Sequence, residues 1–180
     1  MIVKPYTPPP LEQREQWLDA FRSGWLAHYE QTGQIDWKRY VRPHNQIPVF
    51  GPGVDLNQSR LALITSSGAY WRAHQPPFDA ENPLGDYTIR AIPLSTPLKE
   101  LDYAHMHYDQ AAVRADPQVL LPIHHMQDLA QEGVIGELAP TMVHFMGYQP
   151  DVTRVVDETA PAILEVVHAE RANAALLVPA

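Results

Sequence analysis

The sequence of 180 residues predicts an α/β protein in which a helical arm precedes a three-layer body, a parallel sheet with helices on both faces. Short apolar runs that end in small or polar residues alternate with segments of helical periodicity, which is typical of parallel strands joined by helices. The apolar fraction of 45% and the length of the chain suffice for one folded core.

The N-terminal arm is predicted to contain one amphipathic helix over residues 11–31. Apolar and aromatic side chains recur in it at helical spacing: Leu11, Leu18, Phe21, Trp25 and Tyr29. Gly33 is suited to end the helix, and the prolines and glycines between Asp36 and Ser59 indicate a long irregular loop. Residues 1–59 therefore form the predicted arm and loop.

Three tryptophans mark the arm and its loop: Trp17, Trp25 and Trp37. We expect them to dock the arm on the body of the protein. The alternative is an exposed apolar patch that serves a partner subunit.

The body, residues 60–180, contains four predicted strands: Leu61–Thr65, Tyr87–Pro93, Tyr103–Tyr108 and Ala174–Val178. The first of them is apolar throughout and runs into the turn Ser66-Ser67-Gly68. The last has the small and apolar composition of a strand buried on both faces, so we expect it inside the sheet rather than at its edge.

Two helices are predicted in the body. The first covers Met126–Gln131 and ends at Gly133, and the second begins at Thr159–Pro161. Its predicted buried stripe consists of Ile163, Leu164 and Val167. These elements together predict a Rossmann-like or flavodoxin-like sheet that is C-terminally incomplete, because no covering helix follows Ala180.

Composition excludes several classes of protein. The net charge of −8 opposes binding to the phosphate backbone of nucleic acids. No apolar run approaches the roughly 20 residues that cross a bilayer, and the proline-rich N-terminus lacks a signal-peptide core, so we expect a cytoplasmic protein. The chain contains no Cys, which excludes disulfides and thiolate metal sites.

Four groups of residues, in this order, carry a family resemblance: His74–Asp79 with Gly85–Tyr87 and Arg90–Pro93, His105–Asp109, Gly133–Pro140 with Phe145–Gly147, and Leu176–Pro179. Over about residues 37–180 the chain resembles the glycine/sarcosine/betaine/D-proline reductase selenoprotein B family.

This resemblance implies a reductase component in which a selenolate or thiolate attacks the substrate and a neighbouring cysteine resolves the product. A selenol is ionised at neutral pH, whereas a free thiol is mostly protonated there. The family's selenocysteine-x-x-cysteine motif is expected just beyond Ala180, so the chain as given is expected to be inactive in the redox reaction. A selenocysteine codon, which ordinary hosts translate as a stop, accounts for an end at this point; a natural end at Ala180 is the alternative.

Alternating polar residues form the first candidate site: His105, His107 and Asp109. In a strand these side chains share one face, where zinc or iron would suit them, with His124 or His125 as a further ligand. The alternative is a wall of the active site that acts in acid–base chemistry or stabilises an anion. The resemblance supports His105, Tyr108 and Asp109 as catalytic residues.

The turn Ser66-Ser67-Gly68 forms the second candidate site. Its backbone N–H groups would bind an anion if a helix started there; the alternative is a turn that requires small residues. Arg114 and Asp116 are expected to form a solvated ion pair, and the alternative is that Arg114 clamps a substrate carboxylate. Because α/β sites assemble beyond strand ends, we expect His105, Tyr108 and Asp109 to share one cavity with this turn and with Ala180.

Three functions remain open from the sequence. The first is the substrate-side portion of a selenol- or thiol-dependent reductase acting on a small amine, with a small-molecule substrate and a partner reductase subunit. The second is a metal-dependent enzyme or metal-binding module, and the third is a non-catalytic subunit. A homo-oligomer is expected, because the missing C-terminal helix would leave an apolar surface that a second copy covers.

Overall fold

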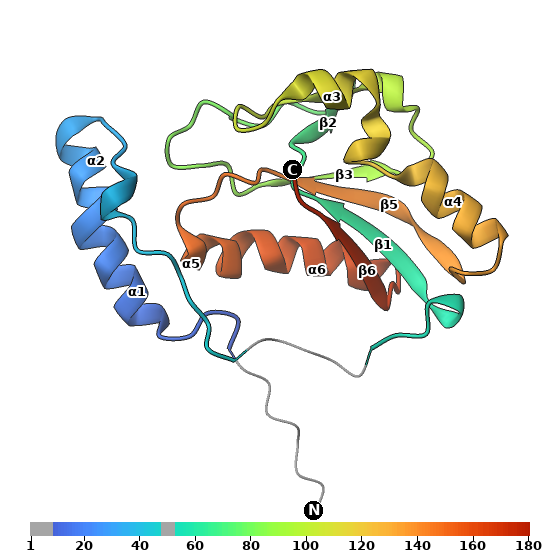
Figure 1. Ribbon diagram of the computed structural model, residues 1–180, viewed down its shortest axis with the longest axis horizontal. Helices are drawn as coiled ribbons and strands as arrows, with labels where there is room; N and C mark the ends of the chain where they lie inside the picture. The colour runs from blue at the N-terminus through green and yellow to red at the C-terminus, as the bar shows by residue number, and fades with distance from the viewer. Residues whose placement is uncertain (1–8, 48–52) are drawn as a thin grey trace, which may run out of the picture.

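A four-stranded sheet lies at the centre of the computed structural model, which describes residues 9–47 and 53–180 (Figure 1). In spatial order its strands are β3 (Ile89–Pro93), β5 (Glu137–Phe145), β1 (Arg60–Thr65) and β6 (Ala174–Val178). β1 is parallel to both β5 and β6, whereas β3 is antiparallel to β5. The predicted α/β architecture is confirmed, with one antiparallel strand where the sequence had suggested a wholly parallel sheet.

Helices lie on both sides of this sheet (Figure 1). One side carries α3 (Gln110–Ala115) and α4 (Ile123–Gln131); the other carries α5 (Val152–Arg154), the π-helical segment η6 (Val155–Thr159) and α6 (Ala160–Ala169). Single 3-10 turns cover Trp37–Arg39, Leu56–Gln58, Leu98–Glu100 and Pro117–Val119. None of the helices within the described ranges is long and apolar enough to cross a membrane.

The main core lies between the sheet and α3 and α4. It joins side chains from three strands to side chains from both helices: Leu61, Leu63, Ile92, Met142, Val113, Ile123 and Met126. β1 has a paired strand on each side, and Leu61 and Leu63 on one face and Ala62 and Ile64 on the other are all buried. Burial on both faces explains why this strand is apolar throughout rather than alternating.

A second, smaller sheet pairs β2 (Ala69–Trp71) with β4 (Leu101–Tyr103) in antiparallel fashion. The prediction of a strand over Tyr103–Tyr108 is therefore wrong beyond its first residue. After Ala104, side chains accept hydrogen bonds from nearby backbone N–H groups that a neighbouring strand would otherwise pair with. His105 Nδ1 accepts from the N–H of His107 at 3.0 Å, and Asp109 Oδ1 accepts from the N–H of Ala111 at 2.8 Å. Such local bonds favour turns and helix caps over strands.

The predicted arm helix is present as one helical stretch made of α1 (Arg14–Phe21), the π-helical segment η1 (Arg22–Leu26) and α2 (Ala27–Thr32). Trp17, Phe21 and Trp25 are buried, with Val152 and Val156 of the body packed against them. Docking by Trp17 and Trp25 is thereby confirmed. Of the loop predicted between residues 36 and 59, residues 48–52 lie outside the described residues.

The prediction that Ala174–Val178 lies inside the sheet is wrong. β6 is an edge strand that pairs with β1 alone, and Leu177 is 69% exposed. The stripe predicted on α6 is not buried either, since Leu164 is 50% exposed and Ile163 and Val167 are half-buried. Apolar composition indicates that a surface favours burial, but only the tertiary structure decides which group, if any, covers it.

Candidate functional site

A cavity of about 470 Å³ lies beyond the carboxyl ends of β1, β5 and β6. Its lining comes from four separate segments: Ser66, His105, His107, Phe145, Gly147, Tyr148, Pro179 and Ala180. The expectation that His105, the first serine of the turn and Ala180 share one cavity is confirmed. Tyr108 and Asp109 do not line it.

The turn Ser66-Ser67-Gly68 ties the strand ends together. The N–H of Ser66 donates to Val178 O at 3.2 Å and that of Gly68 to Phe145 O at 3.0 Å. The N–H of Ser67 donates to Thr65 Oγ1 at 3.2 Å. All three amides are thus engaged, and the turn leads into β2 rather than a helix, so the anion-binding turn at a helix start is not formed.

The same turn requires a residue without a side chain at Gly68. Its φ is +65°, and a Cβ built there would lie 2.7 Å from Ala104 O and 3.2 Å from His105 Cβ. Left-handed backbone and close contact both favour glycine. The turn therefore places the backbone of β1 directly against the segment that carries His105.

His105 is the buried polar group of this cavity. It is 5% exposed, and because its Nδ1 accepts a hydrogen bond from the N–H of His107, the ring proton resides on Nε2. Nε2 has no hydrogen-bond partner among the described residues. A Cβ placed on Gly147 would lie 3.4 Å from both His105 Nε2 and Ser66 Oγ, so this N–H is directed at the cavity wall that they share.

Burial keeps the imidazole of His105 uncharged. Desolvation, and to a smaller extent the charge of nearby His107, lowers the pKa of His105 below its ordinary value of 6.5. At neutral pH the side chain is therefore a neutral N–H donor in a place with little water. Such a donor stabilises negative charge that develops on an oxygen, sulfur or selenium atom.

The ring of Tyr108 packs against the imidazole of His105. The two rings lie 4.5 Å apart, and the Tyr108 hydroxyl donates to Ser67 O at 2.9 Å. Burial raises the pKa of this hydroxyl well above its ordinary value. The hydroxyl proton is thus held in the hydrogen bond to Ser67 O. We therefore assign Tyr108 the role of positioning the imidazole of His105.

Asp109 and Arg114 lie outside the cavity. Asp109 caps the N-terminus of α3, while the exposed Arg114 donates to Asp102 at 3.2 Å and to Gln110 at 2.9 Å. Arg114 is thus engaged in a solvated ion pair, as the sequence predicted, but its partner is Asp102 and not Asp116.

The metal-site geometry that a strand would have produced is absent. His105, His107 and Asp109 follow the end of β4 at Tyr103 and do not share a face of a strand. Throughout residues 9–47 and 53–180, no group of three His, Cys, Asp or Glu side chains is placed to hold a metal ion.

A second buried histidine lies beside the turn. His144 on β5 is fully buried, its Nδ1 lies 3.2 Å from Ser67 Oγ, and desolvation lowers its pKa to about 3. Phe145, Gly147 and Tyr148, which follow His144 in the chain, line the His105 cavity.

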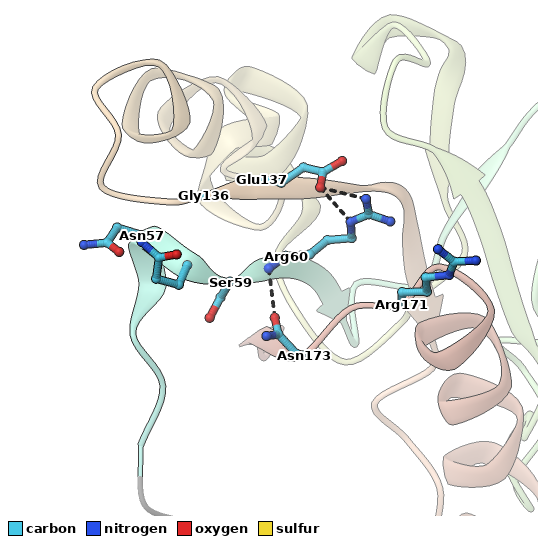
Figure 2. A pocket seen from close by; sticks show the side chains of 8 residues that line it. Asn57, Ser59, Arg60, Gly136, Glu137, Arg171 and Asn173 are labelled. Carbon is cyan, nitrogen blue, oxygen red and sulfur yellow. Dashed lines mark hydrogen bonds and ion pairs between the residues drawn. The ribbon is translucent and has the colours of Figure 1, made fainter.

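A cavity at the opposite end of the sheet was not predicted (Figure 2). It measures about 420 Å³ and lies at the amino ends of β1 and β5. Arg60 pairs there with Glu137 at 2.7 Å, and its backbone N–H donates to Asn173 Oδ1 at 2.8 Å (Figure 2). Its guanidinium also donates to Glu170 O at 2.7 Å. Because ligands of open α/β sheets bind at the carboxyl ends, the His105 cavity is the candidate site.

Comparison with known proteins identifies the class to which this fold and site belong. The family model described as glycine/sarcosine/betaine reductase selenoprotein B matches residues 37–179, and the chain belongs to this family. No solved structure matches the chain significantly.

Three curated relatives of known name are similar to the chain over part of their length. The chain is 33% identical over 131 residues to the D-proline reductase subunit gamma of Acetoanaerobium sticklandii, covering 72% of this chain and 52% of that protein. It is 34% identical over 110 residues to the sarcosine reductase complex component B subunit beta of Peptoclostridium acidaminophilum (56% and 25%). It is 29% identical over 96 residues to the glycine reductase complex component B subunit gamma of Symbiobacterium thermophilum (52% and 22%). The aligned part spans about half of the first relative and about a quarter of the others.

Proposed function

We propose that this chain forms the substrate-side part of a selenol- or thiol-dependent reductase that cleaves a small amine or a related molecule. Family membership supports the proposal, as do relatives that are components of D-proline, sarcosine and glycine reductases. By this resemblance, the chain works together with a partner reductase subunit on a small-molecule substrate.

The observation that carries the proposal is the neutral, buried imidazole of His105. Its Nε2–H has no partner among the described residues and borders the cavity beside Ser66. A fixed N–H donor on a buried side chain stabilises a selenolate, a thiolate or a developing oxyanion, because the donor need not reorient when the charge develops. We assign His105 this role, with Tyr108 as its positioning residue.

The attacking atom comes from outside these residues, because none of the 180 is Cys. The backbone N–H of Ala180 donates to Ser66 Oγ at 2.9 Å, so the chain at this position is held at the cavity wall. In keeping with the family resemblance, we propose a selenocysteine directly after Ala180 as the nucleophile. We propose that a selenol or thiol presented there reaches the donor on His105, because Ala180 and His105 line the same cavity.

A single engineered thiol tests this role. In Ala180→Cys the new thiol is the only one in the protein, so its pKa follows from the rate of alkylation by iodoacetamide at increasing pH. We expect a pKa about one unit below the ordinary 8.5, because an N–H bond to the thiolate favours the charged form. Adding His105→Leu is expected to abolish the shift.

Val119→Cys is the matched control, since Val119 is 53% exposed and does not line the cavity. Thermal unfolding of each variant shows whether it is folded. Equal thiol pKa values in Ala180→Cys and Val119→Cys would refute the proposed role of His105.

A non-catalytic subunit is the second candidate, and exposed apolar surface on β6 and α6 favours it. Leu164 and Leu177 are 50% and 69% exposed. Surfaces of this kind serve contacts with a partner subunit or a second copy. An unshifted thiol pKa in Ala180→Cys, together with a stable oligomer in sedimentation experiments, would make assembly the better account.

A further inference from the structure

Ser67 lies at the centre of a hydrogen-bond network beside the His105 cavity. It is fully buried and does not itself line the cavity. Its N–H donates to Thr65 Oγ1 at 3.2 Å, its Oγ lies 3.2 Å from His144 Nδ1, and its C=O accepts from the Tyr108 hydroxyl at 2.9 Å. Because all three polar groups are bonded, the position of Ser67 within the turn is fixed.

The hydrogen bond between Ser67 and His144 has a defined direction. Ser67 Oγ accepts from the N–H of Ala69 at 3.3 Å, so its own proton is free to be donated. Among the described residues, the acceptor within reach is Nδ1 of His144, which is unprotonated because burial lowers the pKa of this ring to about 3. Ser67 therefore donates to Nδ1, and the ring proton of His144 lies on Nε2.

His144 is held in place by the central sheet. It lies on β5, where its paired residues are Thr65 of β1 on one side and Arg90 of β3 on the other. Pairing on both sides fixes its backbone, and complete burial restricts its ring. Groups carried by paired strands are placed more precisely than groups carried by loops. His144 thus ties the turn at Ser67 to the most rigid part of the molecule.

Two contacts connect Ser67 and its turn to His105. The first is made by Tyr108, whose hydroxyl donates to Ser67 O and whose ring lies 4.5 Å from that of His105. The second is made by Gly68, whose C=O accepts from the N–H of Ala104 at 3.0 Å and whose backbone lies close to His105 Cβ. Both contacts restrict where the imidazole of His105 can lie.

His105 depends on this support because it has few hydrogen bonds of its own. Its Nδ1 accepts from the N–H of His107 at 3.0 Å, whereas Nε2 has no partner among the described residues. The residue itself belongs to no strand. A single hydrogen bond does not fix the tilt of an imidazole, and a misplacement of about 1 Å can cost a catalytic group about 100-fold in rate.

We infer that Ser67 and His144 are positioning residues, which orient the imidazole of His105 through Tyr108 and Gly68 without touching the cavity. This inference rests on the proposed function for the purpose of the donor, and it deepens that function by naming the residues that hold the donor in place. It also explains a histidine in the core. A leucine would fill this position of β5 without a buried ring nitrogen that lacks a partner, so the histidine serves more than packing.

The tautomer of His105 tests the inference in the 180-residue protein. ¹⁵N NMR of imidazole rings distinguishes a nitrogen that carries a proton from one that accepts a hydrogen bond, and it requires no thiol. We expect a single Nε2–H tautomer of His105 in the unaltered protein. In Ser67→Ala and in His144→Leu we expect a mixture of both tautomers, because the ring is no longer held against the N–H of His107.

Two further substitutions of His144 separate hydrogen bonding from packing. His144→Asn keeps an acceptor near the place of Nδ1 and is expected to retain the single tautomer of His105. His144→Gln places its amide nearer to Nε2 and is expected to lose it. When each is combined with Ala180→Cys, the thiol pKa is expected to stay about one unit below its ordinary value with His144→Asn and to return toward about 8.5 with His144→Gln.

Val143→Ala is the matched control. Val143 is the residue before His144 on β5, is 1% exposed and points to the opposite face of the sheet. The substitution removes buried apolar surface from the same strand but leaves the Ser67 network intact. The tautomer of His105 and the thiol pKa are therefore expected to stay unchanged. Amide NMR spectra show whether each variant is folded; if His144→Leu is unfolded, Ser67→Ala decides.

A mixture of tautomers in the unaltered protein, or a single unchanged tautomer in Ser67→Ala, would overturn the inference. An equal change in Val143→Ala would overturn it too, because it would indicate a general loosening of the fold. None of these results refutes the role of His105 as a donor, since the thiol pKa of Ala180→Cys tests that role separately. An ordinary thiol pKa in Ala180→Cys, with the tautomers changed as expected, would refute the donor role and leave the positioning pair standing.

Discussion

The central sheet has a cavity at each end, and the two differ in how their polar groups are satisfied. At the amino ends, Arg60 is paired with Glu137 and hydrogen-bonded to the backbone of Glu170, and the pair is partly exposed to water. At the carboxyl ends, His105 and His144 are buried and each keeps one ring nitrogen without a partner in the described part of the chain.

The difference indicates where chemistry is located. Buried polar groups are normally hydrogen-bonded, so a buried group without a partner calls for a functional explanation. Surface charges that already form an ion pair interact less strongly with a ligand, and such pairs contribute little to the free energy of unfolding. Of the two cavities, only the one at the carboxyl ends is lined by a buried side chain whose polar atom lacks a hydrogen-bond partner among the described residues.

The largest expected effect concerns the pH dependence of stability that arises from His144. Its pKa is about 3 in the folded protein and about 6.5 in an unfolded chain, so below pH 6.5 the unfolded state binds more protons and stability falls. We expect His144→Leu to remove a loss on the order of 3 kcal/mol between pH 6.5 and pH 4. Urea unfolding at a series of pH values measures it; parallel curves for the two proteins would contradict it.

A smaller effect is expected from the backbone at the carboxyl end. Gly68→Ala forces a side chain into left-handed backbone and against Ala104 O, so we expect a loss of about 2–3 kcal/mol in the free energy of unfolding. Gly133→Ala is the matched control, because Gly133 is also left-handed, with φ +74°, but has no atom within 4 Å of the added Cβ. That variant is expected to lose only about 1 kcal/mol. Equal losses in urea unfolding would show that close packing at the turn is unimportant.

The smallest effect is expected at the amino ends. Glu137→Gln breaks the pair with Arg60, and because both side chains are partly exposed the loss should stay below about 1 kcal/mol and vanish in 1 M salt. Glu165→Gln on the exposed side of α6 serves as the control. A loss of several kcal/mol from Glu137→Gln would remove the contrast between the two ends of the sheet.

Local sequence patterns predicted most of the elements. Helical spacing of aromatic residues identified the arm helix, now residues 14–32, and the apolar run Leu61–Thr65 identified β1. Glycine marked the ends of two helices, at Gly33 and Gly133, where the backbone is left-handed. These features depend on neighbouring residues, which is why the sequence alone suffices for them.

Contacts that periodicity does not record decided what the patterns left open or had wrong: strand pairing between distant segments, and hydrogen bonds from side chains to nearby backbone. Nothing in the composition of Ala174–Val178 distinguishes a central strand from an edge strand, and the pairing of β6 with β1 alone made it an edge. The alternation of His105, His107 and Asp109 suggested a strand. Hydrogen bonds from side chains to nearby backbone amides instead stabilise a turn in that segment, and Asp109 caps the N-terminus of α3.

The sequence by itself determined the family, the α/β class and the meeting of Ser66 and Ala180, because the carboxyl ends of the parallel strands β1 and β6 lie at one edge of the sheet. His105 was expected at the same edge, but it follows β4 of the smaller antiparallel sheet, and the close approach of Gly68 to Ala104 and His105 brings it there. Only the tertiary structure decided which side chains face the cavity and in what state. Burial makes the imidazole of His105 a neutral donor, and packing of the arm brings Trp37 beside Tyr148. Both results depend on desolvation and on contacts between residues far apart in the chain, which no local pattern records.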